Sequence, residues 1–354
     1  MSQASGWLVG TLLATAGLPG CHSRPPSDPP SAVSAAPGDG GTPGDPPPAP
    51  KTTEFATAGP AASHEVVPVK FDPDRALKYL RQLCDLGPRV SGTDGMKKQQ
   101  ELIEKHFRDL GATVTRQEFK ARQRSRKTDT PMVNLIISWH PDKARRVLLC
   151  SHYDTRPIAD QEPNRNNWNK PFLSANDGTS GVAFLMELGH HIKDLKCELG
   201  IDFVLFDGEE YVFETNPLGG GDKYFIGSDY FADDYAKTKS ARKFRYEAAV
   251  LLDLFAGQGA QLKVEQYSYA GAPRLVEQIW GLARAIGARS FKYEPGYEVQ
   301  DDHLALLRVG IPAVDIIDFD YPHWHKLSDT PDKVSGAQMV EVSNVLTTWL
   351  QKIK

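Results

Sequence analysis

The stretch Val147-Leu148-Leu149-Cys150-Ser151-His152-Tyr153-Asp154 is the most informative part of this sequence. Its apolar run predicts a buried strand, and a histidine and an aspartate follow that strand closely. In open α/β sheets, ligands bind beyond the carboxyl ends of the strands. Further acidic or histidine-bearing motifs therefore belong to the same predicted site, and His and carboxylate groups are typical zinc ligands. These motifs are Asp177-Gly178, Asp207-Gly208-Glu209-Glu210, Asp253 and His323-Trp324-His325.

Strand-like and helix-like segments alternate along the chain. The strand-like runs are Thr113–Phe119, Val133–Trp139, Val147–Cys150, Ile201–Phe206, Ala249–Leu254 and Ala313–Ile317. Helical spacing of apolar residues is found in residues 94–110, 181–192, 273–286 and 336–353. Such alternation is typical of α/β proteins. We therefore predict a single domain with a central mixed, mostly parallel sheet flanked by helices.

Composition divides the chain into three regions. Residues 1–21 resemble a bacterial lipoprotein signal peptide, because a short apolar stretch leads to small residues before Cys21. An ordinary cleaved signal or an uncleaved tail is the alternative. Residues 22–65, rich in Pro, Ala, Gly and Ser, predict a disordered tether. Residues 66–354 have the apolar content of one catalytic domain. We thus expect an exported protein, anchored to a bacterial membrane by a lipid on Cys21, in the periplasm or at the cell surface.

Charge and cysteine content narrow the function classes. The formal net charge is −4, and no block of Lys and Arg is interleaved with aromatic residues, so nucleic acid is not an expected partner. We interpret the basic run Lys120–Lys127 as a solvated loop between strands. Besides Cys21 the chain contains Cys84, Cys150 and Cys197, without the spacing of a zinc ribbon. Cys150 is expected to be a buried thiol, and the sequence does not assign a disulfide.

The adjacent carboxylates Glu209 and Glu210 carry the clearest chemical signal. Two carboxylates at the end of a buried strand repel each other, and a bound cation removes that cost while leaving one of them to carry a proton. Taken singly, His152 fits a structural histidine equally well, and Asp177 fits a helix cap. The candidate zinc ligands are His152, Asp177, Glu210, Asp253 and His325.

In order and spacing, these motifs resemble the metal-site motifs of the M28 zinc aminopeptidase superfamily, over nearly all of residues 66–354. The resemblance implies the zinc aminopeptidase fold, which is phosphorylase/hydrolase-like. Within the superfamily, Gln300-Asp301-Asp302-His303 and Trp324 resemble the glutaminyl-peptide cyclotransferases, most closely the bacterial enzymes of the animal-like type. Asp315 stands where animal members have a histidine, and no tryptophan follows the two glutamates within Tyr211–Thr215 as it does in animal members.

The cyclotransferase resemblance implies one zinc ion per chain, held by Asp177, Glu210 and His325. Zinc would polarise the side-chain amide of an N-terminal glutamine in a peptide or protein, and Glu209 would pass a proton from the α-amine to the departing ammonia. The product is a pyroglutamyl peptide. The resemblance also implies catalytic roles for Asp253 and Asp301, joined as a hydrogen-bonded pair, and substrate-binding roles for Gln300, Trp324 and Asp315.

The alternative within the superfamily is an M28 aminopeptidase that hydrolyses N-terminal residues. His152 and Asp253 would then help to hold a second metal ion, and Glu209 would activate a water molecule. Gln300–His303 and Trp324 favour the cyclotransferase, although Gln300–His303 also fits a helix start capped by acids. A binding protein without catalysis would lack a ligand or Glu209, and neither is missing. The sequence leaves open the peptide substrates, the metal count, the oligomeric state and the membrane face.

Overall fold

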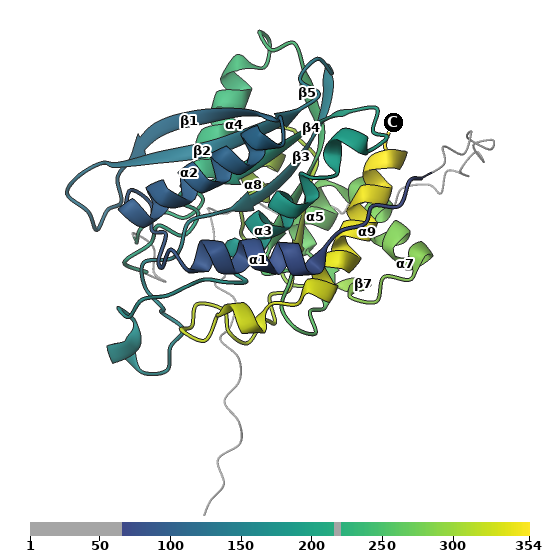
Figure 1. The fold of residues 1–354 in the computed structure, drawn as a ribbon. Helices are drawn as coiled ribbons and strands as arrows, with labels where there is room; N and C mark the ends of the chain where they lie inside the picture. Colours follow the sequence, from purple (N-terminus) through teal and green to yellow (C-terminus); the bar gives the residue numbers. More distant parts are fainter. Residues whose placement is uncertain (1–65, 216–220) are drawn as a thin grey trace, which may run out of the picture. The chain divides into compact units, whose positions relative to one another are not determined.

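The computed structural model describes residues 66–215 and 221–354 (Figure 1). The predicted signal peptide, residues 1–21, and the predicted tether, residues 22–65, lie outside the described residues. Within the described ranges, no helix has the length and apolar character needed to cross a membrane.

A six-stranded sheet in the order β1-β2-β4-β3-β5-β8 forms the centre of the described domain (Figure 1). β3, β4, β5 and β8 run parallel, whereas β2 is antiparallel to both β1 and β4. All six predicted strands are present, and the prediction of a mixed, mostly parallel sheet is confirmed. Their bounds are Thr113–Ala121 (β1), Thr130–Trp139 (β2), Arg145–His152 (β3), Gly200–Phe206 (β4), Arg245–Asp253 (β5) and Ala313–Ile317 (β8).

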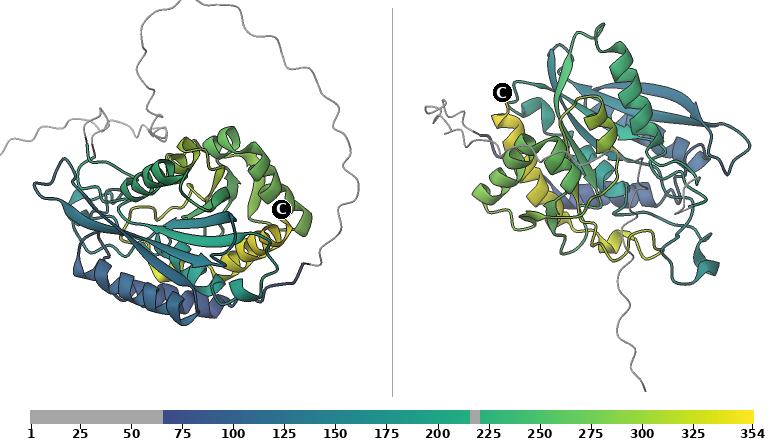
Figure 2. Two further views of the ribbon diagram at one scale, coloured as in Figure 1. Left: turned by 90° about the horizontal axis from the view of Figure 1, so that it is seen from above. Right: turned by 180° about the vertical axis from the view of Figure 1, so that it is seen from behind.

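Helices cover both faces of this sheet (Figure 2). The larger core lies between one face and the helices α1 (Pro73–Cys84), α2 (Asp94–Asp109), α3 (Thr179–Leu188) and α9 (Gly336–Lys352). The other face packs against α4 (Ile226–Thr238) and α8 (His303–Arg308). Side chains of β3 alternate between the two cores, because Leu149 points to the first while Leu148 and Cys150 point to the second. Burial on both faces explains why this strand is apolar throughout.

The remaining α-helices and strands lie between β5 and α8 in the sequence. They are β6 (Leu262–Val264), α5 (Gln266–Gly271), α6 (Pro273–Val276), α7 (Leu282–Ile286) and β7 (Phe291–Pro295). β6 and β7 form a small parallel sheet of their own. The predicted helix over residues 273–286 is therefore interrupted, because a turn of π-helix at Glu277–Gly281 separates α6 from α7.

The three cysteines of the described domain are free thiols. Cys84 and Cys150 are buried, and Cys197 is half-buried. Burial raises the pKa of the Cys150 thiol well above its ordinary value. The prediction that Cys150 is a buried thiol is confirmed.

Glu187, on the last turn of α3, fastens this helix to α1. Its buried carboxylate accepts the backbone N–H of Asp72 at 2.9 Å and Nη2 of Arg75 at 2.8 Å. His191 Nε2 lies 3.1 Å from the same oxygen. Although burial opposes it, these partners lower the pKa of Glu187 to about 2. The contact holds in place the helix whose first turn follows Asp177.

Replacing Glu187 by Gln is expected to destabilise the protein by ~1–3 kcal/mol at pH 7, since hydrogen bonds to a buried charge are lost. A carboxyl whose pKa is lowered on folding adds stability above its unfolded pKa, and that stability disappears as the pH falls through its folded pKa. The difference from wild type should therefore shrink between about pH 4 and the Glu187 pKa of about 2. Urea unfolding at several pH values measures it.

Asp109→Asn is the matched control, because Asp109 pairs with Lys105 on an exposed part of α2. This variant should stay within about 0.5 kcal/mol of wild type. A Glu187→Gln deficit that does not change down to the lowest pH would contradict the assigned role.

Candidate active site

The predicted motifs meet at the carboxyl edge of the sheet. His152 ends β3, Asp253 ends β5, and Glu209 and Glu210 follow β4. Asp253, Glu209 and Glu210 border a cavity of about 440 Å³, whose wall also includes Gln300, Asp301, Trp324 and His325. A hollow of about 490 Å³, lined in part by His140, Lys143 and Cys197, lies at the opposite edge. We assign the chemistry to the first cavity, because the adjacent carboxylates Glu209 and Glu210 face it together with His325.

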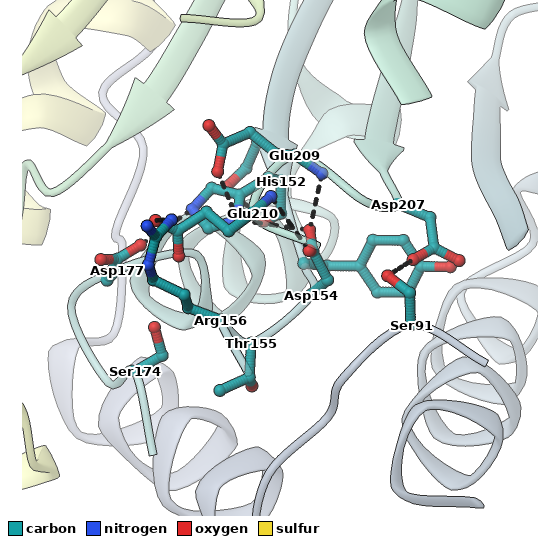
Figure 3. Close-up of polar contacts among 12 residues, drawn as sticks. Ser91, His152, Asp154, Thr155, Arg156, Ser174, Asp177, Asp207, Glu209 and Glu210 are labelled. Carbon is teal, nitrogen blue, oxygen red and sulfur yellow. Dashed lines mark hydrogen bonds and ion pairs between the residues drawn. The ribbon is translucent and has the colours of Figure 1, made fainter. Parts of the chain in front are cut away.

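A tight turn after β4 directs Glu209 and Glu210 to the cavity. Gly208 adopts a φ of 76°, which favours glycine. The two oxygens of Asp154 accept the backbone N–H groups of Glu209 and Glu210, each at 3.1 Å (Figure 3). Asp207 is held in turn by the Ser91 hydroxyl at 2.6 Å. The turn that carries both glutamates is therefore fixed by its neighbours before any ligand binds.

Asp177 is positioned by the start of α3. Gly178 has a φ of 72°, and a Cβ atom on it would lie 2.6 Å from Cε1 of His152, so only glycine fits. Asp329 accepts the backbone N–H groups of Asn176 at 2.9 Å and Asp177 at 3.2 Å. The side chain of Asp177 makes no capping hydrogen bond to α3. The interpretation of Asp177 as a helix cap is therefore wrong, and its carboxylate faces His152 instead.

The candidate metal ligands lie close together. One ligand atom from each of His152, Asp177 and Glu210 falls within a group 4.8 Å across. His325 Nε2 contacts Oε1 of Glu210 and lies 3.8 Å from Oδ2 of Asp177. Asp253 Oδ1 is 3.2 Å from His152 Nε2. Both predicted ligand sets thus share Asp177 and Glu210, with His325 on one side and the His152–Asp253 pair on the other.

The charge balance of this cluster fits a bound cation. Oδ2 of Asp177 and Oε2 of Glu210 are buried, and no residue of the described ranges forms a hydrogen bond with either oxygen. Burial and the charge of Glu210 raise the pKa of Asp177 to about 8. Two ionised carboxylates this close repel each other, and a divalent cation between them removes that repulsion. Carboxylate and imidazole ligands suit zinc, so the residues present fit a zinc ion.

Glu209 and Glu210 differ sharply in their surroundings. Burial, reinforced by the charge of Glu210, raises the pKa of Glu209 well above its ordinary value. Burial acts on Glu210 too, but His325 and Arg156 outweigh it and lower the Glu210 pKa to about 2. Two carboxyl groups whose pKa values are driven apart are suited to separate tasks. Glu210 fits a permanently ionised ligand, and Glu209 fits a proton carrier.

Arg156 and Asp160 belong to the site although the sequence analysis did not select them. Arg156 donates to both oxygens of Asp160, at 3.0 and 2.8 Å, and its Nη1 lies 3.5 Å from Oε1 of Glu210 (Figure 3 shows Arg156 beside Glu210). The other neighbour of Asp160 is His325, whose Nδ1 is 2.9 Å away. Asp160 therefore links Arg156 to His325. Their position in the sequence could have indicated them, since Arg156 and Asp160 follow within six residues of Asp154.

Buried aspartates meet in and beneath the cavity wall, at Asp253, Asp301, Asp302 and Asp315. Burial and the charges of Asp253 and Asp302 raise the pKa of Asp301 well above its ordinary value. A side-chain hydrogen bond joins Asp301 to Asp315, whereas Asp253 acts on Asp301 only through its charge, so the predicted Asp253–Asp301 hydrogen bond is not formed. Asp315 is fully buried and absent from the cavity wall. The resemblance implied a substrate-binding role for Asp315, but it is not placed to touch a substrate and contacts Asp301 instead.

Gln300, Asp301 and Trp324 complete the wall. Asp302 precedes α8 without a side-chain capping bond, so the acid-capped helix interpretation is not supported. Trp324 is half-buried, with its ring 4.1 Å from that of His325 and 4.9 Å from that of Phe319. His325 itself has a φ of 51°, a conformation that non-glycine residues rarely adopt outside functional sites. The segment thereby presents an aromatic wall and an imidazole to the same cavity.

Residues 134–350 match peptidase family M28. The chain belongs to peptidase family M28. A solved structure of Fimbriiglobus ruber glutaminyl cyclase is 57% identical, covers 84% of this chain and 100% of its own, and superposes with a TM-score of 0.80. A leucine aminopeptidase precursor from Bacteroides thetaiotaomicron is 29% identical, covers 82% of this chain and 100% of its own, and has a TM-score of 0.76.

Among relatives known from sequence, bovine glutaminyl-peptide cyclotransferase is 24% identical over 250 residues, which are 61% of this chain. The chain spans 65% of the length of that bovine protein. The M28 family is thus shown, and glutaminyl cyclases are among its relatives by both sequence and structure. The M28 fold also confirms the predicted fold class.

Proposed function

We propose that this M28 protein is a zinc-dependent glutaminyl-peptide cyclotransferase, which converts the N-terminal glutamine of peptides or proteins to pyroglutamate and releases ammonia. One observation carries the proposal: Gln300, Asp301 and Trp324 line the same cavity as Glu209 and Glu210. Those three residues carry the likeness to cyclotransferases rather than peptidases. The 57% identity to the Fimbriiglobus ruber glutaminyl cyclase supports the same reaction.

Asp177, Glu210 and His325 would hold one zinc ion. When bound, zinc supplies a Lewis acid that polarises the side-chain amide of the substrate glutamine. The α-nitrogen then bonds to the side-chain carbonyl carbon, and the bond from that carbon to the amide nitrogen breaks. Glu209 takes the proton that the α-nitrogen loses and delivers it to the departing nitrogen, which leaves as ammonia. Trp324 shields the ring that forms from water.

Asp253 and Asp301 hold the reacting α-amine in this account. Asp301 borders the cavity, and its raised pKa lets it keep a proton and donate a hydrogen bond as well as accept one. Asp253, in the same wall, accepts a hydrogen bond from the amine. Asp315 contributes from beneath, through a side-chain hydrogen bond to Asp301.

An M28 aminopeptidase is the second candidate, because His152 and Asp253 are close enough to serve a second metal ion. The likeness to the leucine aminopeptidase precursor supports it. Two peptides that differ only in their first residue separate the reactions. Following both by mass, we expect the glutaminyl peptide to lose ammonia and the leucyl peptide to stay intact. Release of free leucine would show that the protein is an aminopeptidase and not a cyclase.

Replacing Asp160 by Asn is expected to lower zinc affinity ~10–100-fold, the usual cost of removing the partner of a metal-binding histidine. Asp160 lies 2.9 Å from His325 Nδ1 and, with a pKa of about 2, keeps its charge to orient that imidazole. Competition for zinc with a chelating dye measures the change. Asp194→Asn, at an exposed site, should bind zinc like wild type. Equal affinity in the Asp160→Asn variant would remove Asp160 from the zinc site.

Export and lipid attachment at Cys21 are part of the same proposal, supported by the apolar stretch and small residues before that cysteine. Peptide N-termini would then meet the enzyme at a membrane surface. Labelling cells with a radioactive fatty acid tests the attachment, and label that persists in Cys21→Ser would refute it.

A further inference from the structure

The basic run between β1 and β2 is a surface feature that the proposed reaction does not use. Its five cationic side chains, all exposed, are Lys120, Arg122, Arg124, Arg126 and Lys127. The exposed Lys223 adds a sixth where the run meets the chain before α4. Asp129 lies 3.6 Å from Arg122. Within residues 66–215 and 221–354, no acidic group pairs with Lys120, Arg124 or Lys127. We call residues 120–127 the basic loop.

The basic loop is fastened to the protein rather than free in solvent. Gln123 is buried, its Nε2 donates to the carbonyl oxygens of Tyr211 and Lys223, both at 2.6 Å, and its Oε1 accepts the N–H of Lys223 at 2.8 Å. Ser125 donates its N–H and hydroxyl to Asp222, at 2.9 and 2.6 Å. The backbone that carries the cations of the loop is therefore held in place by Gln123 and Ser125.

An aromatic contact adds to this anchoring. The guanidinium carbon of Arg126 lies 3.2 Å from the centroid of the Phe213 ring. Phe213 belongs to the chain that leaves Glu210, and Tyr224 and Phe225 at the other end of that chain line the cavity. The charges of the basic loop are thus preorganised next to the segment that borders the active site.

Sheet topology puts the basic loop on the same edge as the cavity. β2 is antiparallel to β4, with Leu135 opposite Leu205, so the start of β2 lies beside the carboxyl end of β4. The loop joins β1 to β2 at this end (Figure 1). Neighbouring strands are ~4.8 Å apart and residues along a strand ~3.4 Å apart, so the cations that lie beyond Thr130 are on the order of 10–15 Å from the turn that carries Glu209. Extended peptide covers ~3.4 Å per residue, so about three to five residues bridge that gap.

The cavity wall and the loop differ in charge. The carboxylates of Asp253 and Glu298 line the cavity and disfavour acidic residues near the N-terminus of a substrate. The basic loop attracts carboxylates farther along the peptide. We propose that the basic loop binds acidic side chains of the substrate from about its fourth residue onward. This selectivity rests on the proposed cyclisation and adds a class of preferred substrate: peptides with a neutral start and an acidic continuation.

The test uses the full-length protein and two glutaminyl peptides. They share their first three residues and continue with three glutamates or three glutamines. We expect kcat/KM to be roughly 5–10-fold higher for the acidic peptide, since two or three exposed ion pairs give that gain. The higher kcat/KM should come from a lower KM, and the difference between the peptides should decrease with added salt, because salt screens exposed charges.

A double variant, Arg124→Ala with Lys127→Ala, should lose the preference and keep its rate on the glutamine-rich peptide. Lys237→Ala with Lys239→Ala removes the same charge from the end of α4, before β5 begins at the opposite edge, and should keep the preference. Retention of the preference by the Arg124→Ala/Lys127→Ala variant would overturn the proposal.

Two further outcomes would also overturn it, and they are distinguishable. Equal rates on both peptides in the wild type would refute the acidic subsite and leave the cyclase standing. In that case, vesicles of phosphatidylserine should also be tested. If the wild type bound them and the Arg124→Ala/Lys127→Ala variant did not, the loop would bind a membrane surface instead of a peptide. Failure to cyclise either peptide would refute the proposed function, and the acidic subsite with it.

Discussion

Replacing Glu209 by Gln is expected to lower kcat on a glutaminyl peptide by ~10²–10⁴-fold, the range that a general acid–base group contributes. The substitution keeps the shape of the side chain and removes its capacity to carry a proton. Glu209 lies outside the group of ligand atoms formed by His152, Asp177 and Glu210, and its nearest imidazole atom, Nδ1 of His152, is 3.7 Å away. Zinc content should therefore stay at the wild-type level. Single-turnover assays and metal analysis of one preparation measure both quantities.

Glu214→Gln is the matched control for this variant. Glu214 is exposed, follows Glu209 closely in the sequence and does not line the cavity, so its loss should leave kcat unchanged. Full activity in Glu209→Gln would show that another group carries the proton. Loss of zinc from Glu209→Gln would instead make Glu209 a ligand, and the division of labour between the two glutamates would be wrong.

Replacing His325 by Ala is expected to remove zinc and activity together. Its Nε2 contacts Glu210 and approaches Asp177, so the imidazole completes the proposed ligand set. Loss of a ligand should exceed the ~10–100-fold cost of losing a ligand's hydrogen-bond partner, so we expect zinc affinity to fall by more than ~100-fold. Titration with zinc, followed by calorimetry on the metal-free protein, measures that fall.

His323→Ala serves as the control, because His323 is two residues away and its Nδ1 lies 2.9 Å from the Ser328 hydroxyl rather than in the cavity. It should bind zinc normally. If His325→Ala bound zinc normally, the zinc ligands would instead be His152, Asp177 and Glu210. The two variants thus decide which imidazole holds the proposed single zinc ion.

The strands and most of the site residues could be predicted because both follow from one sequence signal, an apolar run followed by polar residues. A strand buried on both faces is a continuous apolar run, as in Val147–Cys150, and the next polar residues mark the edge where the site forms. Adjacent carboxylates at such an edge, Glu209 and Glu210, then need a cation or a proton. Local sequence carries all of this information.

The supporting residues could not be predicted in the same way. Asp154 holds the backbone of Glu209 and Glu210, and Asp329 holds that of Asn176 and Asp177, across large separations in the chain. Such contacts depend on how loops meet in the folded protein. For the same reason, the sequence showed that Asp315 is near the site but not that it lies beneath the cavity wall.

Among the helices that were not predicted, α1 and α4 differ in their sequence signals. α1 carries a clear start signal, because Asp72 caps it and Pro73 occupies its first turn, and Leu80 and Leu83 face the core. That signal was available. α4 has a weak one, because Phe225 precedes it with a φ of 58° and makes no side-chain capping bond. Its position is set by packing of Phe231 and Tyr235 against the sheet, which a local pattern does not reveal.

Zinc titration of the metal-free protein, with pyroglutamyl peptide measured at each step, tests the central claim most directly. We expect no product without metal and a rate that rises in proportion to zinc until one ion is bound per chain, with no shorter peptide at any point. Full activity without metal, or a free N-terminal residue appearing as a second ion binds, would contradict a one-zinc cyclase built on Asp177, Glu210 and His325.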